Sequence, residues 1–233
     1  MDDYSKIHYG DQLANFEDTQ KSLLQFYEET VKRLFINLPE GASVLDLGAG
    51  SCLLGLALRK FPKMSYQAVE PDEYFYASAK SRGLNVYKND ALTFLSSLES
   101  ETIDCVFCKD LIEHLSLDDF TTLVIEINRV LKPGGIWVSH QPNPDSPWFS
   151  GVFFSDLTHV TAYSSRLLDK YLRQKNFKDF YAHEDFLAPG TRYRYIRKVL
   201  WLVVKQIYKL AIIAEPCPPV TVFSRNYFFV VKK

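Results

Sequence analysis

The sequence predicts an α/β fold, in which a mostly parallel sheet is covered by helices on both faces. Its 233 residues suffice for one large domain with a full core. From Ser43 onward, short apolar runs alternate with stretches of helical periodicity, which is typical of parallel strands buried on both faces. A glycine turn joins the first apolar run to the helix after it. We therefore expect a single domain over residues 1–233, with leading helices in 1–40, a ligand-binding core in 41–145 and a distinct region in 146–233.

The hydrophobic pattern predicts the elements in order. Residues 13–37 place apolar side chains at helical spacing, which predicts one or two leading helices. Short apolar runs predict strands at 43–47, 65–70, 84–87, 103–108, 135–140, 179–185 and 226–231. The stretches between them predict helices near 52–60, 72–82, 91–97, 117–131 and 164–174. A Lys132-Pro133-Gly134-Gly135 break should end the helix at 117–131 and lead into the fifth strand.

The composition excludes several classes of protein. Apolar residues make up 47% and charged residues 24% of the chain, which are ordinary values for a globular domain. The net charge of −1 gives no electrostatic basis for binding nucleic acid, and we expect no such partner. The four cysteines lack a disulfide spacing and the acidic start is unlike a secretory leader, which together predict a cytoplasmic protein. No uninterrupted apolar run reaches membrane-spanning length.

The pair Cys105-x-x-Cys108 has the spacing of half a redox or zinc site, but it lies inside the predicted strand 103–108. Residues three apart on a strand point to opposite faces, so the two thiols should diverge into the core. The sequence contains no dense His/Asp cluster that demands a metal, and we expect none.

The first strand leads into the run Val44-Leu45-Asp46-Leu47-Gly48-Ala49-Gly50-Ser51-Cys52. Gly48 and Gly50, with Ala49 between them, let the backbone approach a ligand, and the following helix start aims free N–H groups at it. Asp46 stands just before the turn, where an acid would repel a pyrophosphate but suits a cationic ligand with an amino group. The turn therefore points to S-adenosylmethionine rather than to a nucleotide phosphate.

Further polar residues follow the next strands, and ligands of open α/β sheets bind at the carboxyl ends of strands. Glu70 ends the second strand, and its carboxylate can accept hydrogen bonds from both hydroxyls of an adenosine ribose. Asp90 follows the third strand and could accept from an adenine amino group. The other candidate cofactor-binding residues at these strand ends are Pro71, Ala91, Lys109, Asp110 and His114.

This series, from Ser43 to Asn143, resembles the class I S-adenosylmethionine-dependent methyltransferases. The matching pieces are Val44-Leu45-Asp46-Leu47-Gly48-Ala49-Gly50, Val69-Glu70-Pro71-Asp72, Asp110-Leu111-Ile112-Glu113-His114-Leu115 and Leu131-Lys132-Pro133-Gly134-Gly135. The resemblance implies a Rossmann-like three-layer sandwich whose seven-stranded sheet is mostly parallel, with the last strand antiparallel. It makes 41–145 the cofactor-binding core and 146–233 the acceptor side. It also places the glycine turn around the methionine part, Glu70 on the ribose and Asp90 near the adenine.

Two other hypotheses share the cofactor pattern. Nicotinamide dehydrogenases have a similar strand, turn and helix, but their G-x-G-x-x-G fingerprint requires a third glycine where this chain has Leu53. A regulatory protein that binds S-adenosylmethionine without transferring methyl would retain the turn but lack an acceptor cleft. The chain also departs from many methyltransferases at Cys52, where they place a third glycine; because Cys52 begins the helix, we expect the change to affect packing more than binding.

The acceptor is less well defined by the sequence. A hydroxyl acceptor needs a base, and histidine is the usual choice, so His159 and His140 are the candidate catalytic residues. His140 follows the fifth strand, which should place it at the mouth of the pocket. The segment 153–164 around His159 resembles a methyltransferase subgroup linked to surface polysaccharide or lipopolysaccharide synthesis, which implies a sugar or glycan hydroxyl as acceptor. A small phenol or quinone is the alternative acceptor, and His159 could instead bond to Asp156 or a backbone carbonyl and only fix its loop.

Residues 192–214 predict a basic amphipathic helix between the last two strands. Four basic residues fall on one face beside Trp201 and Tyr208, and the apolar residues fall opposite. One interpretation is a helix packed on the core with a solvated polar face. The others are a peripheral contact with a membrane surface, or a docking face for an anionic acceptor that is linked to a lipid or nucleotide. The Pro-rich break at 215–219 should end the helix.

Overall fold

The computed structural model describes residues 16–61, 64–185, 194–215 and 220–233. The start of the leading segment (1–15), the first two residues of the helix expected at 192–214, and most of the break at 215–219 lie outside these ranges. The helices are α2 (Phe16–Leu34), α3 (Leu53–Leu58), α4 (Glu73–Ser81), α5 (Ala91–Ser97), the 3₁₀ turn η1 (Ile112–His114), α6 (Leu117–Val130), α7 (Phe149–Phe153), α8 (Ser165–Gln174) and α9 (Arg194–Ala214).

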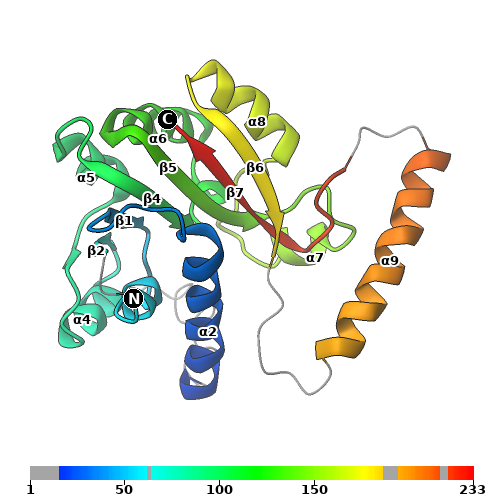
Figure 1. Ribbon diagram of the computed structural model, residues 1–233, viewed down its shortest axis with the longest axis horizontal. Helices are drawn as coiled ribbons and strands as arrows, with labels where there is room; N and C mark the ends of the chain where they lie inside the picture. The colour runs from blue at the N-terminus through cyan, green and yellow to red at the C-terminus, as the bar shows by residue number, and fades with distance from the viewer. Residues whose placement is uncertain (1–15, 62–63, 186–193, 216–219) are drawn as a thin grey trace.

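The strands form one seven-stranded sheet of order β3-β2-β1-β4-β5-β7-β6. They are β1 (Ser43–Leu47), β2 (Ser65–Val69), β3 (Val86–Tyr87), β4 (Ile103–Lys109), β5 (Leu131–Pro142), β6 (Lys178–Glu184) and β7 (Asn226–Lys232). Neighbouring strands from β3 to β5 run parallel, whereas β7 is antiparallel to both β5 and β6 (Figure 1). The predicted sheet is therefore confirmed, including its antiparallel last strand.

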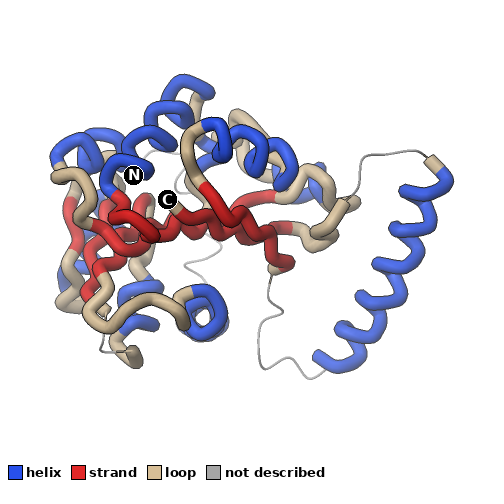
Figure 2. The backbone as a smooth tube through the Cα atoms, turned by 45° about the horizontal axis from the view of Figure 1, so that its top comes forward, coloured by secondary structure: helices blue, strands red, loops and turns tan. Residues whose placement is uncertain are grey.

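Helices cover both faces of the sheet, as Figure 2 shows with the strands running between them. On one face α5, α6 and α8 bury side chains such as Phe94, Leu123 and Leu168 against the strands. On the other face α2 and α3 do so with side chains such as Val31 and Leu54. Cys105 belongs to the second of these clusters and Cys108 to the first, so the two thiols diverge as expected.

Short polar side chains set where several helices begin. Asp72, Ser116 and Ser164 each accept a hydrogen bond from the backbone N–H three residues on, at the starts of α4, α6 and α8. Such caps satisfy donors that have no partner within the helix. They fix the loops at the carboxyl ends of the strands, which is where the expected site lies.

Two expected boundaries differ from the structure. The fifth strand was expected to begin at Gly135, but β5 already pairs Leu131 with Ile103 before Ile136 pairs with Cys105. The stretch between them is a bulge, with Gly134 at a φ of 80°, so the Lys-Pro-Gly-Gly break interrupts the strand instead of preceding it. The third strand is also only two residues long, Val86–Tyr87. The short helix α7 and the turn η1 were not expected, because each is too short for its apolar residues to show a helical repeat in the sequence.

Helix α9 stands apart from the sheet at one side of the molecule (Figure 1). It contacts the rest of the protein through its polar and aromatic side: Lys205 Nζ lies 2.8 Å from Glu184 Oε2, and the Trp201 ring lies 5.3 Å from that of Trp148. Its opposite, apolar side is exposed, with Val203 55% and Ile207 61% accessible. The interpretation that α9 packs its apolar face on the core is therefore wrong. Within the described part of the chain, no helix has the length and apolar character to span a bilayer.

Candidate cofactor and acceptor site

The glycine turn after β1 adopts a backbone that few other residues could replace. Gly48 and Gly50 have φ angles of 64° and 49°, in the left-handed region that favours glycine. A Cβ on Gly48 would lie 3.1 Å from a methyl carbon of Leu111, so the turn packs tightly against the loop after β4. Around Gly50, by contrast, no heavy atom of the described residues lies within 4 Å of the Cβ position. The turn is therefore closed on one side and open on the other, where a ligand can approach.

Asp46 lies buried beneath this turn. Its Oδ2 accepts a hydrogen bond from the Tyr66 hydroxyl at 2.8 Å. Burial raises the pKa of the Asp46 carboxyl to about 7, and the negative charge of Glu70 adds to this rise. A nearby cation would favour the ionised form, so this carboxylate suits the ammonium group of the expected cofactor.

Glu70 joins the ends of the first two strands. Its Oε2 accepts a hydrogen bond from the Gly50 N–H at 2.6 Å, and its Oε1 accepts one from the Asp72 N–H at 2.9 Å. The carboxylate therefore holds the glycine turn and the start of α4 together. Glu70 and Asp46, two of the expected cofactor residues, are thus brought to opposite sides of one turn.

Cys52 adopts an unfavourable backbone conformation that the sequence alone did not reveal. It precedes α3 with a φ of 52°, a left-handed backbone that a residue with a side chain adopts at a cost of about 1–2 kcal/mol. Its side chain is fully buried in a cluster with Ala68 and Ala79. The missing glycine therefore affects backbone conformation as well as packing.

Asp90 lies at the end of β3, where the sequence placed it, and caps a helix. Its Oδ1 accepts a hydrogen bond from the Thr93 N–H at 2.8 Å, at the start of α5. Hydrogen bonds from the Thr93 side chain and the Thr93 N–H keep the pKa of Asp90 below the usual range. Its neighbours in the expected set are Ala91, the first residue of α5, and, at the end of β2, the exposed Pro71.

Lys109, Asp110 and His140 form a charged network at the ends of β4 and β5, in which His140 is buried and the other two side chains are partly exposed. Asp110 has a φ of 50°, and its carboxylate bonds to Lys109 Nζ and, at 2.8 Å, to His140 Nδ1. Burial would raise the pKa of Asp110, but the charges of Lys109 and His140 hold it far below its usual range. Burial would lower the pKa of His140, but the Asp110 carboxylate and Asp185 raise it to about 9.

This network changes the role expected of His140. The ring is 2% exposed and packs between Phe26 and Phe228, so only its edge can contribute to the wall of the cavity beside it. Because its pKa is about 9, the ring carries a proton at neutral pH and has no lone pair to accept one. Of the two candidate bases, the geometry therefore favours His159.

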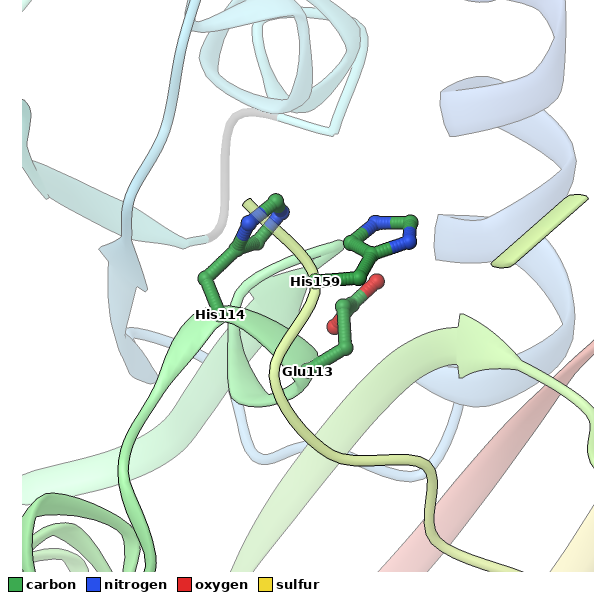
Figure 3. A group of neighbouring side chains, drawn as sticks. All are labelled: Glu113, His114 and His159. Carbon is green, nitrogen blue, oxygen red and sulfur yellow. The ribbon is translucent and has the colours of Figure 1, made fainter. Parts of the chain in front are cut away.

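His114 and His159 lie together with Glu113 on the acceptor side (Figure 3). One ligand atom from each of the three lies within 4.8 Å of the others. The ring centroids of the two histidines are 4.8 Å apart. His159 Nδ1 lies 2.7 Å from the Phe153 carbonyl oxygen, so the expected loop-fixing bond is present. The sequence suggested neither this grouping nor a role for Glu113, because more than forty positions separate His159 from the other two.

The loop that carries His159 is anchored directly to this cluster. The backbone carbonyl of Glu113 accepts hydrogen bonds from the Val160 N–H at 2.7 Å and the Thr161 N–H at 3.1 Å. The Glu113 side chain is 1% exposed, and neither carboxylate oxygen has a hydrogen-bond partner among the described residues. Burial, together with the charge of Asp110, raises the pKa of this carboxyl to about 8.

A cavity of about 1220 Å³ opens between α2, the end of β6 and α9, and Lys109 and His140 form part of its wall. Six basic side chains line it against two acidic ones, Glu184 and Asp185. The basic residues are Arg33, Lys109, Arg197, Lys198, Lys205 and Arg225. The space beside the strand ends is therefore suited to a ligand with negative charge.

Comparisons with known proteins agree with this geometry. Residues 45–139 match the family described as "Methyltransferase domain". The chain is 29% identical over 119 residues to a ribosomal protein L11 methyltransferase of Shouchella clausii (strain KSM-K16). That match covers 50% of this chain and 35% of the relative, so the chain spans about a third of the length of the curated relative it matches.

Solved structures share the fold over nearly the whole chain. A SAM-dependent methyltransferase from Archaeoglobus fulgidus is 21% identical with a TM-score of 0.71, covering 95% of this chain and 99% of that one. Phosphoethanolamine N-methyltransferase 2 of Haemonchus contortus, solved in complex with S-adenosyl-L-methionine, is 19% identical with a TM-score of 0.59, covering 88% of this chain and 51% of that one. Residues 45–139 are thus similar in sequence to the methyltransferase domain family, and the chain shares its fold with solved SAM-dependent methyltransferases.

Proposed function

We propose that the protein transfers the methyl group of S-adenosylmethionine to a hydroxyl oxygen of a sugar- or glycan-type acceptor that carries negative charge. The observation that carries this proposal is the cavity beside Lys109 and His140, with its excess of basic side chains. A sugar linked to a nucleotide or lipid phosphate supplies the charge that such a wall attracts. The hydroxyl-rich acceptor class agrees with the resemblance of the segment around His159 to the polysaccharide-linked subgroup.

The residues divide into a cofactor side and an acceptor side. Asp46, in its ionised form, would hold the ammonium group, the open glycine turn would receive the methionine part, and Glu70 would accept from the ribose hydroxyls. Asp90 would lie toward the adenine. When bound, S-adenosylmethionine supplies a methyl group on a sulfonium sulfur that departs as a neutral thioether.

The acceptor side has to position the hydroxyl in line with the methyl carbon and manage its proton. Positioning alone can supply several kcal/mol of the barrier reduction. His159 is the group placed to act on the proton, because Nδ1 is held by the Phe153 carbonyl and Nε2, on the far side of the ring, lies 4.0 Å from the Asp156 carboxylate. The Lys109–Asp110–His140 network would hold the strand ends in place around the reacting atoms.

A methyl-transfer assay with tritiated S-adenosylmethionine tests the proposal. The acceptors are sugar nucleotides, glycolipids and small phenols, and Glu70→Ala serves as the variant that should lose transfer. We expect label on the sugar acceptors. Label only on a phenol or quinone would overturn the sugar class, and cofactor binding without transfer to any acceptor would favour a regulatory binding protein.

A further inference from the structure

The Glu113–His114–His159 cluster contains a buried carboxylate that lacks a hydrogen-bond partner. Glu113 is 1% exposed, and both of its carboxylate oxygens are unpaired among the described residues. A buried acid with no partner costs several kcal/mol of desolvation unless a ligand or an ion completes it. Its carboxylate points toward the His159 ring (Figure 3).

Both imidazoles hold their hydrogen on Nδ1, which leaves Nε2 with a lone pair when the rings are neutral. The Phe153 carbonyl can only accept, so His159 Nδ1 donates to it at 2.7 Å. The Thr158 hydroxyl donates to Asp156 Oδ1 at 2.6 Å, and its oxygen therefore accepts from His114 Nδ1 at 2.8 Å. Metal-binding histidines are oriented in this way, with the far ring nitrogen donating to a carbonyl or hydroxyl.

We propose that Glu113, His114 and His159 bind one divalent transition-metal ion, of the class of Mn²⁺, Co²⁺ or Zn²⁺, through a carboxylate oxygen and two imidazole nitrogens. This ligand set of two histidines and one carboxylate suits such ions and leaves coordination positions open. The three ligand atoms lie within 4.8 Å of one another. Ligands of one ion with bonds near 2.1 Å lie roughly 3 Å apart, so small side-chain rotations would close the site.

The inference rests on the proposed function and refines how His159 acts in it. The acceptor hydroxyl would bind the ion through its oxygen, and the ion would lower the hydroxyl pKa so that the proton passes to water. The oxygen lone pair then forms the C–O bond to the methyl carbon as the S–C bond breaks. The electrons of that bond return to sulfur, which leaves as the neutral thioether. His159 therefore acts through the metal and does not take the proton itself.

Metal binding is measured first, without acceptor or cofactor, so that it is independent of the proposed function. The full chain is stripped with EDTA and titrated with Mn²⁺ or Zn²⁺ chloride by calorimetry. We expect one ion per chain, and at least about tenfold weaker binding in His159→Gln and Glu113→Gln. His183→Gln is the matched control, because His183 lies on β6 outside the cluster, and it should bind as the wild type does.

Three results would overturn the inference. These are a wild-type chain that binds no ion, a His159→Gln variant that binds as well as the wild type, and loss of binding in His183→Gln. Retained binding of S-adenosylhomocysteine in His159→Gln shows that the variant is folded. Methyl transfer that proceeds equally with EDTA and with added metal overturns the role of the metal in hydroxyl activation. Absence of transfer to any acceptor counts against the proposed function, and the result of the metal titration still stands.

A second inference rests on α9 and is independent of the metal. The helix carries five basic residues and no acidic one, and its exposed side bears a continuous set of large apolar side chains. These are Tyr195, Ile196, Val199, Leu200, Leu202, Val203, Ile207, Leu210 and Ile213. Isolated exposed apolar residues are ordinary, but a contiguous patch of this kind marks a contact surface.

We infer that α9 lies on an anionic membrane surface, with its apolar side in the headgroup region and Arg197 and Lys209, which flank that side, near the lipid phosphates. The excess of positive charge on α9 favours an anionic surface over a second, equally basic copy of the helix. The opposite side of α9 is already held by Glu184 and Trp148, which fixes which side faces outward. Such in-plane helices combine apolar burial with attraction to anionic lipids.

Co-sedimentation of the full chain with vesicles tests this surface. Vesicles of phosphatidylcholine alone are compared with vesicles of equal parts phosphatidylcholine and phosphatidylglycerol. We expect binding to the anionic vesicles, most of which is lost in Val203→Asp and Ile207→Asp. Ile125→Asp introduces the same charge at an exposed apolar residue of α6, away from α9, and should retain most binding. Absence of vesicle binding, or a dimer in solution that Ile207→Asp dissociates, would overturn the membrane assignment.

Discussion

The two carboxylates beside the glycine turn, Glu70 and Asp46, have different roles although both lie near the expected ligand. Burial raises the pKa of both carboxyls, but at Glu70 hydrogen bonds from the Asp72 and Gly50 N–H groups oppose the rise, whereas at Asp46 the pKa reaches about 7. A charged ligand therefore affects them differently. Glu70 is ready as an acceptor, and Asp46 becomes charged most readily when a cation is present.

Replacing Glu70 by alanine should weaken the binding of S-adenosylhomocysteine by at least about tenfold, because charge-assisted hydrogen bonds contribute roughly 1.5–3 kcal/mol each. Isothermal titration calorimetry measures this change. Glu73→Ala is the control, since Glu73 is nearby but exposed and pairs with Lys88 on the surface. Equal affinities of Glu70→Ala and the wild type would remove Glu70 from the cofactor site.

Cofactor affinity should also depend on pH through Asp46. In the free protein its pKa is about 7, so the carboxyl is largely protonated below that value and ionised above it. Binding of the ammonium group favours the ionised form, and the affinity should therefore rise as the pH increases through this range. In Asp46→Asn the affinity should be lower and flat with pH. A wild-type affinity that does not change between one unit below and one unit above that pKa would contradict this assignment.

At the scale of elements, a cap and a ligand contact can be confused. Asp90 caps α5 through the Thr93 N–H, and that bond alone accounts for its position in the structure. Its expected contact with adenine is a separate claim. Two substitutions at the same residue separate them, because serine keeps the cap and alanine removes it.

Asp90→Ala should lower the free energy of unfolding by about 1 kcal/mol, whereas Asp90→Ser should leave it close to the wild-type value. Urea unfolding measures the contribution of the cap to the free energy of unfolding. If Asp90 also contacts adenine, both variants should bind S-adenosylhomocysteine more weakly. Wild-type affinity in Asp90→Ser would show that Asp90 acts only as a cap.

At the scale of the whole molecule, the strand ends of β4 and β5 are joined by a charged network around the buried His140 ring. Lys109, Asp110 and His140 come from two neighbouring strands, and α2 covers them through Phe26. Since an isolated buried charge is costly, each member depends on the others. Global stability should therefore respond to the protonation of this network.

The pKa of His140 is raised in the folded protein, from about 6.5 to about 9. The stability that this proton supplies is fully present below about 6.5 and is lost as the pH rises through about 9. The free energy of unfolding in urea should thus fall over this range in the wild type. His140→Asn should be less stable at neutral pH and lack this decline. A parallel decline in both proteins would assign it to other groups.

The sequence by itself determined the alternation of strands and helices, the order of residues at strand ends and the glycine turn. These are local features, because periodicity, caps and turns are encoded by neighbouring residues. The sequence did not predict features that depend on contacts between residues far apart in the chain. The bulge in β5 depends on pairing with β4, and the side of α9 that faces outward depends on contacts with Glu184 and Trp148.

Only the tertiary structure decided which distant residues share a site. It buried His140 beside Asp110 and so gave it a proton, and it brought His159 to Glu113 and His114 across a long stretch of chain. The physical reason is that burial and long-range contact set pKa values and ligand geometry, and neither is written in the spacing of residues along a sequence.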